Sequence, residues 1–385
     1  MEARAQARSP AALAAVYATV FLDLLGFGII LPSLPYYAQE LGASGLGLGL
    51  LFTSYSLAQL VGAAALGRLS DRVGRRPVLL ASLAGSAVSM LASGLAGSLS
   101  ALCLARAAAG LFGGSISTAQ AYIADTTRPE ERARYMGLLG ASIGSGFVLG
   151  PALGAGLVAA GFGFAGAAFT AAGLAAANLA FAAAKLPESR PQGGAGARPA
   201  FARTLGLPRL RPLLAATFLT TFAFVAMETT FAYLGKARFG LEERGFGLIL
   251  VYVGVIVIAI QGGAVGALTR RLGVGRVAVA GALGLGVSLA ALPFCPTLPA
   301  TLAALGLLAA GQGLASPSLA TLLSQATGAT EQGSVLGAGQ SFSALARAVG
   351  PLVAGSLYDL AIPLPFLAGG VLALAAGALL AGRKA

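Results

Sequence analysis

The sequence contains no histidine, only two cysteines and few charged side chains. Without histidine, catalysis, metal binding and pH switching that depend on an imidazole are excluded. Cys103 and Cys295 both lie in apolar runs, which argues against a disulfide framework and against a cysteine metal site. The chain is therefore expected to need neither a metal nor any other cofactor.

Charged residues occupy 10% of the 385 positions, whereas 57% are hydrophobic and 56 are glycine, and the mean hydropathy is +0.84. A soluble domain carries roughly 25% charged residues. A soluble globule is excluded, because too few polar side chains remain to cover its surface. A membrane-spanning helix takes about 20 residues, so the apolar and glycine content is enough for about a dozen spans with short loops.

Twelve long apolar stretches can be recognised along the chain. They cover residues 11–37, 47–68, 77–97, 99–123, 133–158, 163–185, 209–235, 246–269, 276–293, 299–325, 332–358 and 362–382. They are weakly periodic and rich in Leu, Ala and Gly, as expected of helices that face lipid or each other. The first stretch is too long for the apolar core of a signal peptide and carries Asp23, so it is predicted to be a span. The expected fold class is an all-α membrane protein.

The basic residues predict the orientation of these spans. With the N-terminus inside, all but five of the 25 Lys and Arg residues lie in cytoplasmic segments. Lys236, Arg238 and Arg244 lie outside, and Arg106 and Arg347 lie within spans. This asymmetry predicts two cytoplasmic termini. The bias toward Leu, Ala, Gly and Arg suggests a bacterial genome of high GC content, so the expected location is a bacterial inner (plasma) membrane. Because the basic residues border spans, they are expected to contact membrane lipids, and nucleic-acid binding is excluded.

The chain is expected to consist of two related halves. Residues 186–208 are rich in Pro, Gly and Arg and are predicted to form a cytoplasmic linker between six-helix bundles at 1–185 and 209–385. Gly150-Pro151 recurs 200 positions later as Gly350-Pro351. Other pairs repeat at nearly the same offset: Gly113 with Gly313, Glu131 with Glu331, Gly137 with Gly337, Gly67 with Gly266 and Leu69 with Leu268. Such an offset predicts a duplicated unit in parallel repeat.

The segment between the second and third spans carries the most specific motif. Residues 67–76 read GRLSDRVGRR, which closely resembles the G-x-L-[SA]-D-R-x-G-R-[RK] motif of the major facilitator superfamily. The resemblance extends to the twelve spans, the central linker and the two related halves, and it implies the major facilitator fold of two pseudo-symmetric bundles. In that family the loop latches the two halves on the cytoplasmic side.

The motif supplies a set of predicted latch residues: Gly67, Asp71, Arg72, Gly74, Arg75 and, in the fourth span, Asp125. Asp71 can sit at the N-terminal end of the helix at 332–358, where amide groups lack partners and the helix dipole is positive. Arg72 and Arg75 can pair with Asp125. Gly67 and Gly74 permit a tight, close-packed turn.

The fifth span carries a second motif. Residues 146–155 read GFVLGPALGA, which resembles the G-x-x-x-G-P-x-x-G-[GA] motif of the antiporter branch of the superfamily, with Gly146, Gly150, Pro151 and Gly154 at its fixed positions. Small residues let two helices approach closely, and proline bends a helix. A generic packing face is the alternative interpretation. The likeness is strongest to the twelve-span drug:proton antiporters, which include tetracycline and multidrug exporters.

Four ionisable residues lie within spans, namely Asp23, Arg106, Glu228 and Arg347. A charge at mid-bilayer costs about 3 kcal/mol on insertion scales, so each is expected to face a cavity or a partner. In the family fold the first and fourth spans are neighbours, so an Asp23–Arg106 pair is expected, and Arg347 can face either Glu228 or the cytoplasmic cavity. Without histidine, Asp23 and Glu228 are the candidate proton carriers, with the two arginines as partners. Buried structural pairs are the alternative.

The resemblance also implies a substrate cavity lined from eight of the spans. The candidate lining residues on those spans are Tyr36, Tyr55, Gln59, Gln120, Phe231, Gln261, Gln312, Gln340 and Phe342. Amides and aromatic rings in an apolar pocket suit bulky amphipathic compounds. Each single residue could instead serve packing or hydrogen bonding between helices.

Together these features predict a secondary active transporter that exports lipophilic drugs or similar small organic molecules. It would exchange them for protons by alternating access, with the proton gradient as its driving force, and would act as a monomer. A different activity of the superfamily, such as solute symport or lysophospholipid transport, is the alternative. A membrane-embedded enzyme is excluded, because the chain lacks histidine, a cysteine cluster and a loop long enough for a catalytic site.

Overall fold

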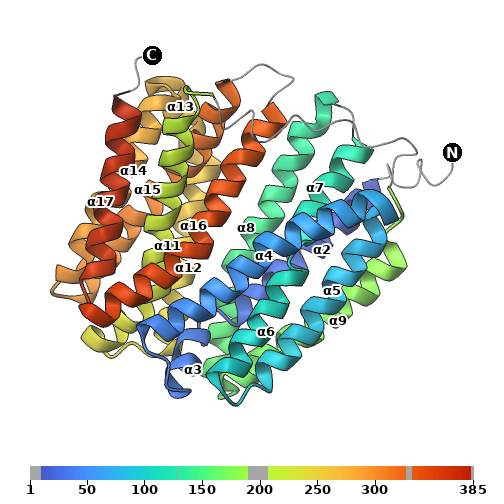
Figure 1. Cartoon of the computed structure of the whole chain (residues 1–385), viewed down its shortest axis with the longest axis horizontal. Helices are drawn as coiled ribbons and strands as arrows, with labels where there is room; N and C mark the ends of the chain where they lie inside the picture. The colour runs from blue at the N-terminus through green and yellow to red at the C-terminus, as the bar shows by residue number, and fades with distance from the viewer. Residues whose placement is uncertain (1–9, 128, 190–206, 327–331, 383–385) are drawn as a thin grey trace. The chain divides into compact units, whose positions relative to one another are not determined.

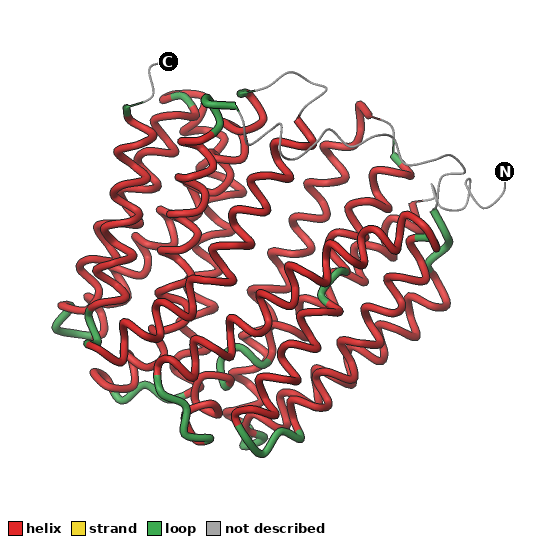
Figure 2. Tube along the Cα trace, in the orientation of Figure 1, coloured by secondary structure: helices red, strands yellow, loops and turns green. Residues whose placement is uncertain are grey.

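The computed structural model describes residues 10–127, 129–189, 207–326 and 332–382. Within these ranges the chain is helical and contains no strand (Figure 2), which confirms the all-α fold class. Residues 1–9 and 383–385, on which the predicted position of the termini partly rests, lie outside the described residues. So does 190–206, which is most of the predicted linker.

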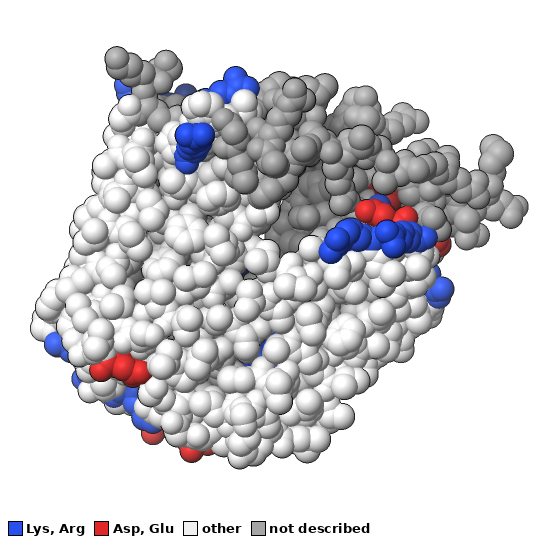
Figure 3. Space-filling model, viewed as in Figure 1, with Lys and Arg blue, Asp and Glu red and all other residues white. Residues whose placement is uncertain are grey.

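Eleven helical segments of the described chain are long and apolar enough to cross a membrane. They are Ala11–Glu40, Gly45–Val73, Arg75–Gly94, Leu99–Thr126, Tyr135–Ala159, Gly163–Lys185, Arg211–Phe239, Glu243–Leu272, Val274–Phe294, Leu298–Gln325 and Leu364–Ala381. The remaining predicted stretch is α16, a helix of 29 residues at Gln332–Leu360 that carries Arg347 and Asp359. On the face drawn in Figure 3, charged side chains lie mainly at the ends of the helices. All twelve predicted stretches are thus helices.

Three of the spans are interrupted. The first consists of α2 (Pro10–Ile29) and α3 (Leu34–Glu40), and the fourth of α6 (Leu99–Phe112) and α7 (Ser115–Thr126). The eighth consists of α12 (Glu243–Ala259), a π-helical turn at Ile260–Ala264 and α13 (Val265–Leu272). Irregular backbone at membrane depth is tolerated where protein packs around it or where it lines a cavity. These interruptions therefore mark places to look for function.

Contacts divide the described residues into two compact units. Unit 1 comprises the described residues of Met1–Gly42, Ser54–Gly196 and Glu243–Val251. Unit 2 comprises the described residues of Ala43–Thr53, Ala197–Glu242 and Tyr252–Ala385. The start of α4 (Gly45–Val73) thus belongs with unit 2, and the start of α12 with unit 1. The predicted domain boundaries at 185 and 209 stay a prediction.

Helices pair in the same order within each unit (Figure 1). In unit 1, α2 packs on α8 (Pro129–Ala159) and α9 (Gly163–Lys185), while α5 (Arg75–Gly94) packs on α9 and α6. In unit 2, α11 (Arg211–Phe239) packs on α16 and α17 (Leu364–Ala381), while α14 (Val274–Ala291) packs on α17 and α15 (Leu298–Gln325). Helix ends repeat as well, since Ser98 caps α6 and Thr297 caps α15, each accepting a hydrogen bond from the amide three residues on. This pattern is that of a duplicated six-helix unit.

The predicted loop at 67–76 is almost entirely helical, so its expected extent is wrong. Helix α4 continues to Val73, and Gly74 alone joins it to α5. Gly74 has a φ of +114°, and Gly273 joins α13 to α14 in unit 2 with a φ of +84°. Side chains are strained at such angles, so glycine is required at both turns. Gly67 lies inside α4, and a Cβ built on it would meet no described atom within 4 Å, so its predicted close packing stays a prediction.

Helices α2 and α8 meet at their backbones. A Cβ atom built on Gly150 would lie 2.6 Å from the Cα of Gly28, and one on Gly28 would lie 2.9 Å from the Cα of Gly150. A Cβ on Gly146 would lie 2.7 Å from the Cβ of Leu24. Pro151 follows within the same helix. The glycines of the second motif therefore allow α8 to lie directly against α2, as small residues do in membrane helix pairs.

Replacing Gly150 should disrupt this contact. Gly150→Ala places a methyl group against the backbone of Gly28, which cannot move aside as a side chain could, so the thermal unfolding midpoint of the purified protein should fall by several degrees. The matched control is Gly156→Ala on the same helix, where nothing lies within 4 Å of the added methyl group. Equal midpoints for the two variants would contradict the contact.

Candidate functional site

Arg75 is the centre of the polar cluster at the α4–α5 turn. Its Nη1 donates to Oδ1 of Asp71 at 2.6 Å and to Oγ of Ser70 at 2.7 Å. Its Nε donates to Oδ2 of Asp125 on α7 at 2.8 Å. Only 8% of Arg75 is exposed. One buried guanidinium therefore ties α4, α5 and α7 together through charge-assisted hydrogen bonds.

Glu188 completes this cluster from the segment that follows α9. Its Oε1 accepts a hydrogen bond from the backbone N–H of Arg75 at 2.8 Å, and its Oε2 accepts one from Arg76 at 3.3 Å. These are unpaired amides at the positive end of the α5 dipole, where a carboxylate is favourable. A Cβ on Gly74 would collide with this carboxylate. The motif alone did not predict Glu188, because it lies more than 100 residues away in sequence.

The latch residues are only partly arranged as predicted. Arg75 contacts Asp125, whereas Arg72 is exposed and pairs with neither Asp71 nor Asp125 among the described residues. The predicted Arg72–Asp125 pair is therefore wrong, because Arg75 already occupies Asp125. The expected place of Asp71 at the start of α16 stays a prediction, since residues 327–331 lie outside the described chain.

Asp23 lies in the middle of α2, and its nearest hydrogen-bond donor is a serine. Oγ of Ser115 donates to Oδ2 of Asp23 at 2.5 Å. Ser115 is the first residue of α7, directly after the break at Gly113 and Gly114. The break in the fourth span thus begins a new helix at the residue that binds the carboxylate. Asp23 itself is partly exposed, so its charge state can respond to its surroundings.

Arg106 of α6 is buried, with 1% of its surface exposed, and lies against two aromatic rings. Its guanidinium carbon is 4.5 Å from the ring centroid of Tyr55 and 5.2 Å from that of Phe27. Its Nη1 has no hydrogen-bond partner in the described chain. The predicted Asp23–Arg106 ion pair is not formed, because Asp23 binds Ser115 and the guanidinium stacks on the rings. Desolvated cation–π contacts contribute about 2 kcal/mol or more each, which offsets part of the several kcal/mol that burying a charge costs.

Glu228 interrupts a buried segment of α11. Val225, Ala226, Met227 and Thr229 are buried, whereas Glu228 is partly exposed. Arg347 of α16 is the charge that acts on Glu228, but no ion pair shorter than 4.0 Å joins Glu228 to another described residue. Arg347 itself is exposed. Unit 2 therefore also carries a carboxylate within a span, with an arginine on a neighbouring helix.

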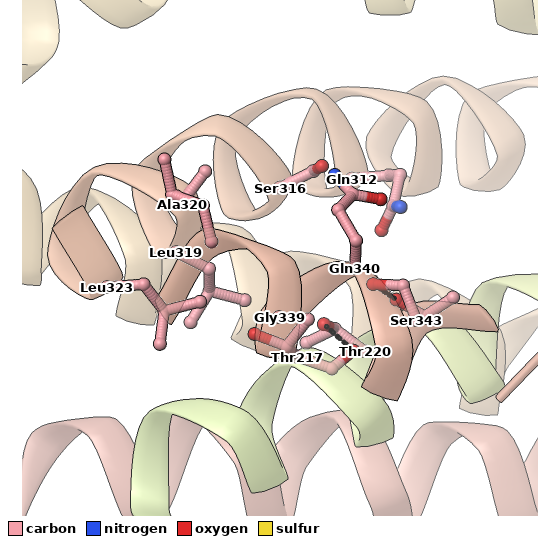
Figure 4. A pocket seen from close by; sticks show the side chains of 12 residues that line it. Thr217, Thr220, Gln312, Ser316, Leu319, Ala320, Leu323, Gly339, Gln340 and Ser343 are labelled. Atoms are coloured by element: carbon pink, nitrogen blue, oxygen red, sulfur yellow. Dashed lines mark hydrogen bonds between the residues drawn. The ribbon is translucent and has the colours of Figure 1, made fainter. Parts of the chain in front are cut away.

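A polar pocket opens in unit 2 between α11, α15 and α16 (Figure 4). Its empty volume, including the open space at its mouth, is about 460 Å³. Gln312 and Gln340, two of the predicted cavity residues, both line it. The sequence reasoning missed its serine and threonine residues, since hydroxyls in apolar helices commonly bond only to their own backbone.

The other predicted cavity residues are placed differently. Tyr55 stacks on Phe27 at a centroid distance of 5.0 Å and accepts a hydrogen bond at its hydroxyl from Nε2 of Gln59 at 3.1 Å. Tyr36 and Phe231 are buried, with 6% and 1% of their surfaces exposed. Gln120 and Gln261 are exposed, and Phe342 packs against the core of unit 2. None of these seven residues lines the pocket of unit 2.

A further carboxylate, which was not predicted from the sequence, caps the start of α4 from the end of α16. Oδ1 of Asp359 accepts a hydrogen bond from the backbone N–H of Gly45 at 2.7 Å, and Oδ2 accepts one from Leu46 at 2.8 Å. Gly49 and Gly355 lie beneath this cap, where a Cβ on either would collide with the backbone of the facing helix. Asp359 therefore holds the first turn of α4 against the end of α16 within unit 2.

Comparison with known proteins agrees with the fold and the motifs. Residues 16–351 and 262–384 match the sequence profile of the Major Facilitator Superfamily. The chain belongs to this superfamily and is a membrane transporter close to its drug-efflux branch.

Two curated relatives and one solved structure illustrate the similarity. The chain is 31% identical to the class C tetracycline resistance protein of Escherichia coli, over 91% of this chain and 90% of the relative. It is 29% identical to multidrug resistance protein 2 of Bacillus subtilis (strain 168), with the same coverage. The crystal structure of the human organic anion transporter MFSD10 (TETRAN) aligns with a TM-score of 0.72 and 27% identity, over 97% of this chain and 100% of that one.

Removing the guanidinium of Arg75 should destabilise the α4–α5 turn. Arg75→Ala leaves Asp71 and Asp125 without their cation and should lower the thermal midpoint of the purified protein by several degrees. Arg72→Ala is the control, because Arg72 is exposed and forms no ion pair in the described chain. A shift as large in Arg72→Ala as in Arg75→Ala would exclude the central role of Arg75.

Proposed function

We propose that this transporter is a proton-coupled antiporter that exports lipophilic or amphipathic small organic molecules by alternating access. The observation that carries the proposal is one carboxylate within a span of each unit, Asp23 in α2 and Glu228 in α11. The similarity to tetracycline and multidrug resistance proteins and the glycines of α8 support it.

The physical argument rests on the cost of charge in a membrane. An ionised carboxylate within a span costs about 3 kcal/mol, whereas its protonated form does not carry this penalty. Protonation therefore favours conformers that enclose the carboxyl group, and deprotonation favours those that expose it or bring an arginine near. Asp23, bound by the neutral hydroxyls of Ser115 and Ser86, and Glu228, on which the charge of Arg347 acts, can both act in this way.

We place the protein in a bacterial inner membrane, as a monomer with both termini in the cytoplasm. The asymmetric distribution of Lys and Arg and the bacterial origin of the efflux relatives support this placement. The same basic residues would contact anionic lipid headgroups. Its partners are then its substrate, protons and lipids.

Neutralising either carboxyl group should abolish proton coupling. In reconstituted vesicles with an imposed pH gradient, Asp23→Asn and Glu228→Gln should each lower tetracycline accumulation by about tenfold or more, because protonation no longer changes the balance of conformers. Glu131→Gln is the control, since Glu131 is exposed near the start of α8. Full gradient-driven transport in both span variants would refute the assignment.

The latch should affect transport rather than assembly when only Asp71 is changed. Asp71→Asn keeps a side chain that can accept from Arg75 but removes the charge that we propose acts at the start of α16. Transport should fall while expression stays normal, as measured by vesicle accumulation per mole of protein. Unchanged transport at normal expression would remove Asp71 from the gating mechanism.

An organic anion is the second candidate substrate, favoured by the buried Arg106 with its unpartnered Nη1 and by the similarity to MFSD10. A panel of cationic, neutral and anionic compounds in the same vesicles separates the two. Transport restricted to anions, and lost in Arg106→Gln, would favour the second candidate.

A further inference from the structure

The pocket of unit 2 has a polar end and an apolar end (Figure 4). The amides of Gln312 and Gln340 lie at one end with the hydroxyl of Ser316, and Leu319 and Leu323 lie at the other. None of the twelve lining residues is charged. A pocket of this kind matches a ligand that is itself part polar and part apolar, without a charge on the part that enters.

Several residues that line this pocket differ from their counterparts in unit 1. Ser316 lies 200 positions after Ile116, and Ser343 lies 200 positions after Ile143, which is the offset of the Gly150-Pro151 repeat. In unit 1, the partly buried Ile116 and Ile143 pack against a core that contains Leu139, which is 1% exposed. Serines replace both isoleucines in unit 2, and glycine stands 200 positions after Leu139, at 339.

These replacements lower the packing energy of the core unless another group fills the space. Serine and glycine fill less volume than isoleucine and leucine, so dispersion contacts and apolar burial are lost at three positions of one core layer. The remainder of that layer in unit 2 is still apolar, as Leu319, Leu323 and Ala338 show. The loss is therefore local to the pocket, as expected where a ligand takes the place of the missing side chains.

Hydrogen-bonding capacity identifies the chemistry of the ligand. The hydroxyls of Thr217 and Thr220 donate to carbonyl groups of their own helix, so each can still accept. Thr221 and Ser343 form a hydrogen bond at 3.3 Å, and Oε1 of Gln312 has no partner in the described chain. A hydroxyl or carboxamide can satisfy such donors and acceptors together. A charged group here would lose its hydration without meeting a counter-charge.

We propose that this pocket binds an uncharged hydroxyl- or carboxamide-bearing part of the substrate. The polar part lies against Gln312, Gln340 and Ser343, and the apolar part lies against Leu319 and Leu323. This inference rests on the proposed export function and adds to it the chemical class of the substrate and a site within unit 2.

Filling the pocket with the residues of unit 1 tests the proposal. Ser316→Ile and Ser343→Ile are each compared with wild type for binding of chloramphenicol, an uncharged amide with two hydroxyl groups, by equilibrium dialysis of the purified protein. Both variants should raise its Kd by about tenfold or more, through lost hydrogen bonds and lost space. Ser316 forms no described hydrogen bond, so Ser316→Ile also covers the case in which Ser343→Ile folds poorly.

Ser341→Ile is the matched control, because Ser341 lies on the same helix two positions from Ser343, is partly exposed and does not line the pocket. Its Kd for chloramphenicol should equal that of wild type. Tetraphenylphosphonium, a cation without hydrogen-bonding groups, should bind with equal affinity to wild type and to all three variants, or to none of them.

Three results would overturn the proposal. They are no binding of chloramphenicol to wild type, a Kd unchanged in both filling variants, or an equal loss of tetraphenylphosphonium affinity. The proposed export function fails separately, if wild-type vesicles bind these probes but accumulate none of them under a pH gradient.

Discussion

The contact between Gly28 and Gly150 determines how the first unit is built. Lipid tails are as apolar as the helices, so helices in a membrane associate through close packing rather than by escape from water. Glycine on both sides brings the backbones of α2 and α8 together. That position of α2 places Asp23 beside Ser115 and Phe27 beneath Arg106. The position of Asp23, one of the two carboxylates proposed to carry protons, therefore depends on a contact between residues that have no side chains.

The two units share their helix pairing but differ in what their helices enclose. Unit 1 contains the Arg75 cluster and the buried Arg106, and it has isoleucine or leucine at three positions where unit 2 has serine or glycine. Unit 2 encloses the uncharged pocket between α11, α15 and α16. Duplication thus preserved the packing of backbones, while substitutions at a few core positions gave each unit different chemistry.

Much of the fold could be predicted from sequence, because apolar stretches of span length and a ten-residue motif depend on local order along the chain. The twelve helices lie where the stretches were expected. The partners of polar side chains were predicted less well, since they depend on which helices meet. Glu188 and Asp359 cap helices that start far away in sequence, and Arg106 stacks on rings where an ion pair with Asp23 was expected. The hydroxyl groups of the pocket carry no sequence signal, because serine and threonine occur throughout these helices.

Substrate-driven release of protons tests the coupling most directly. If substrate and proton compete for conformers of one transporter, binding of one must weaken binding of the other by linkage. Adding a transported drug at saturating concentration to the detergent-solubilised protein, in weakly buffered solution, should release about one proton per protein molecule. The double variant Asp23→Asn/Glu228→Gln should release none while still binding the drug. Equal release from wild type and double variant, or saturable binding to wild type without any release, would contradict proton-coupled antiport through these two carboxyl groups.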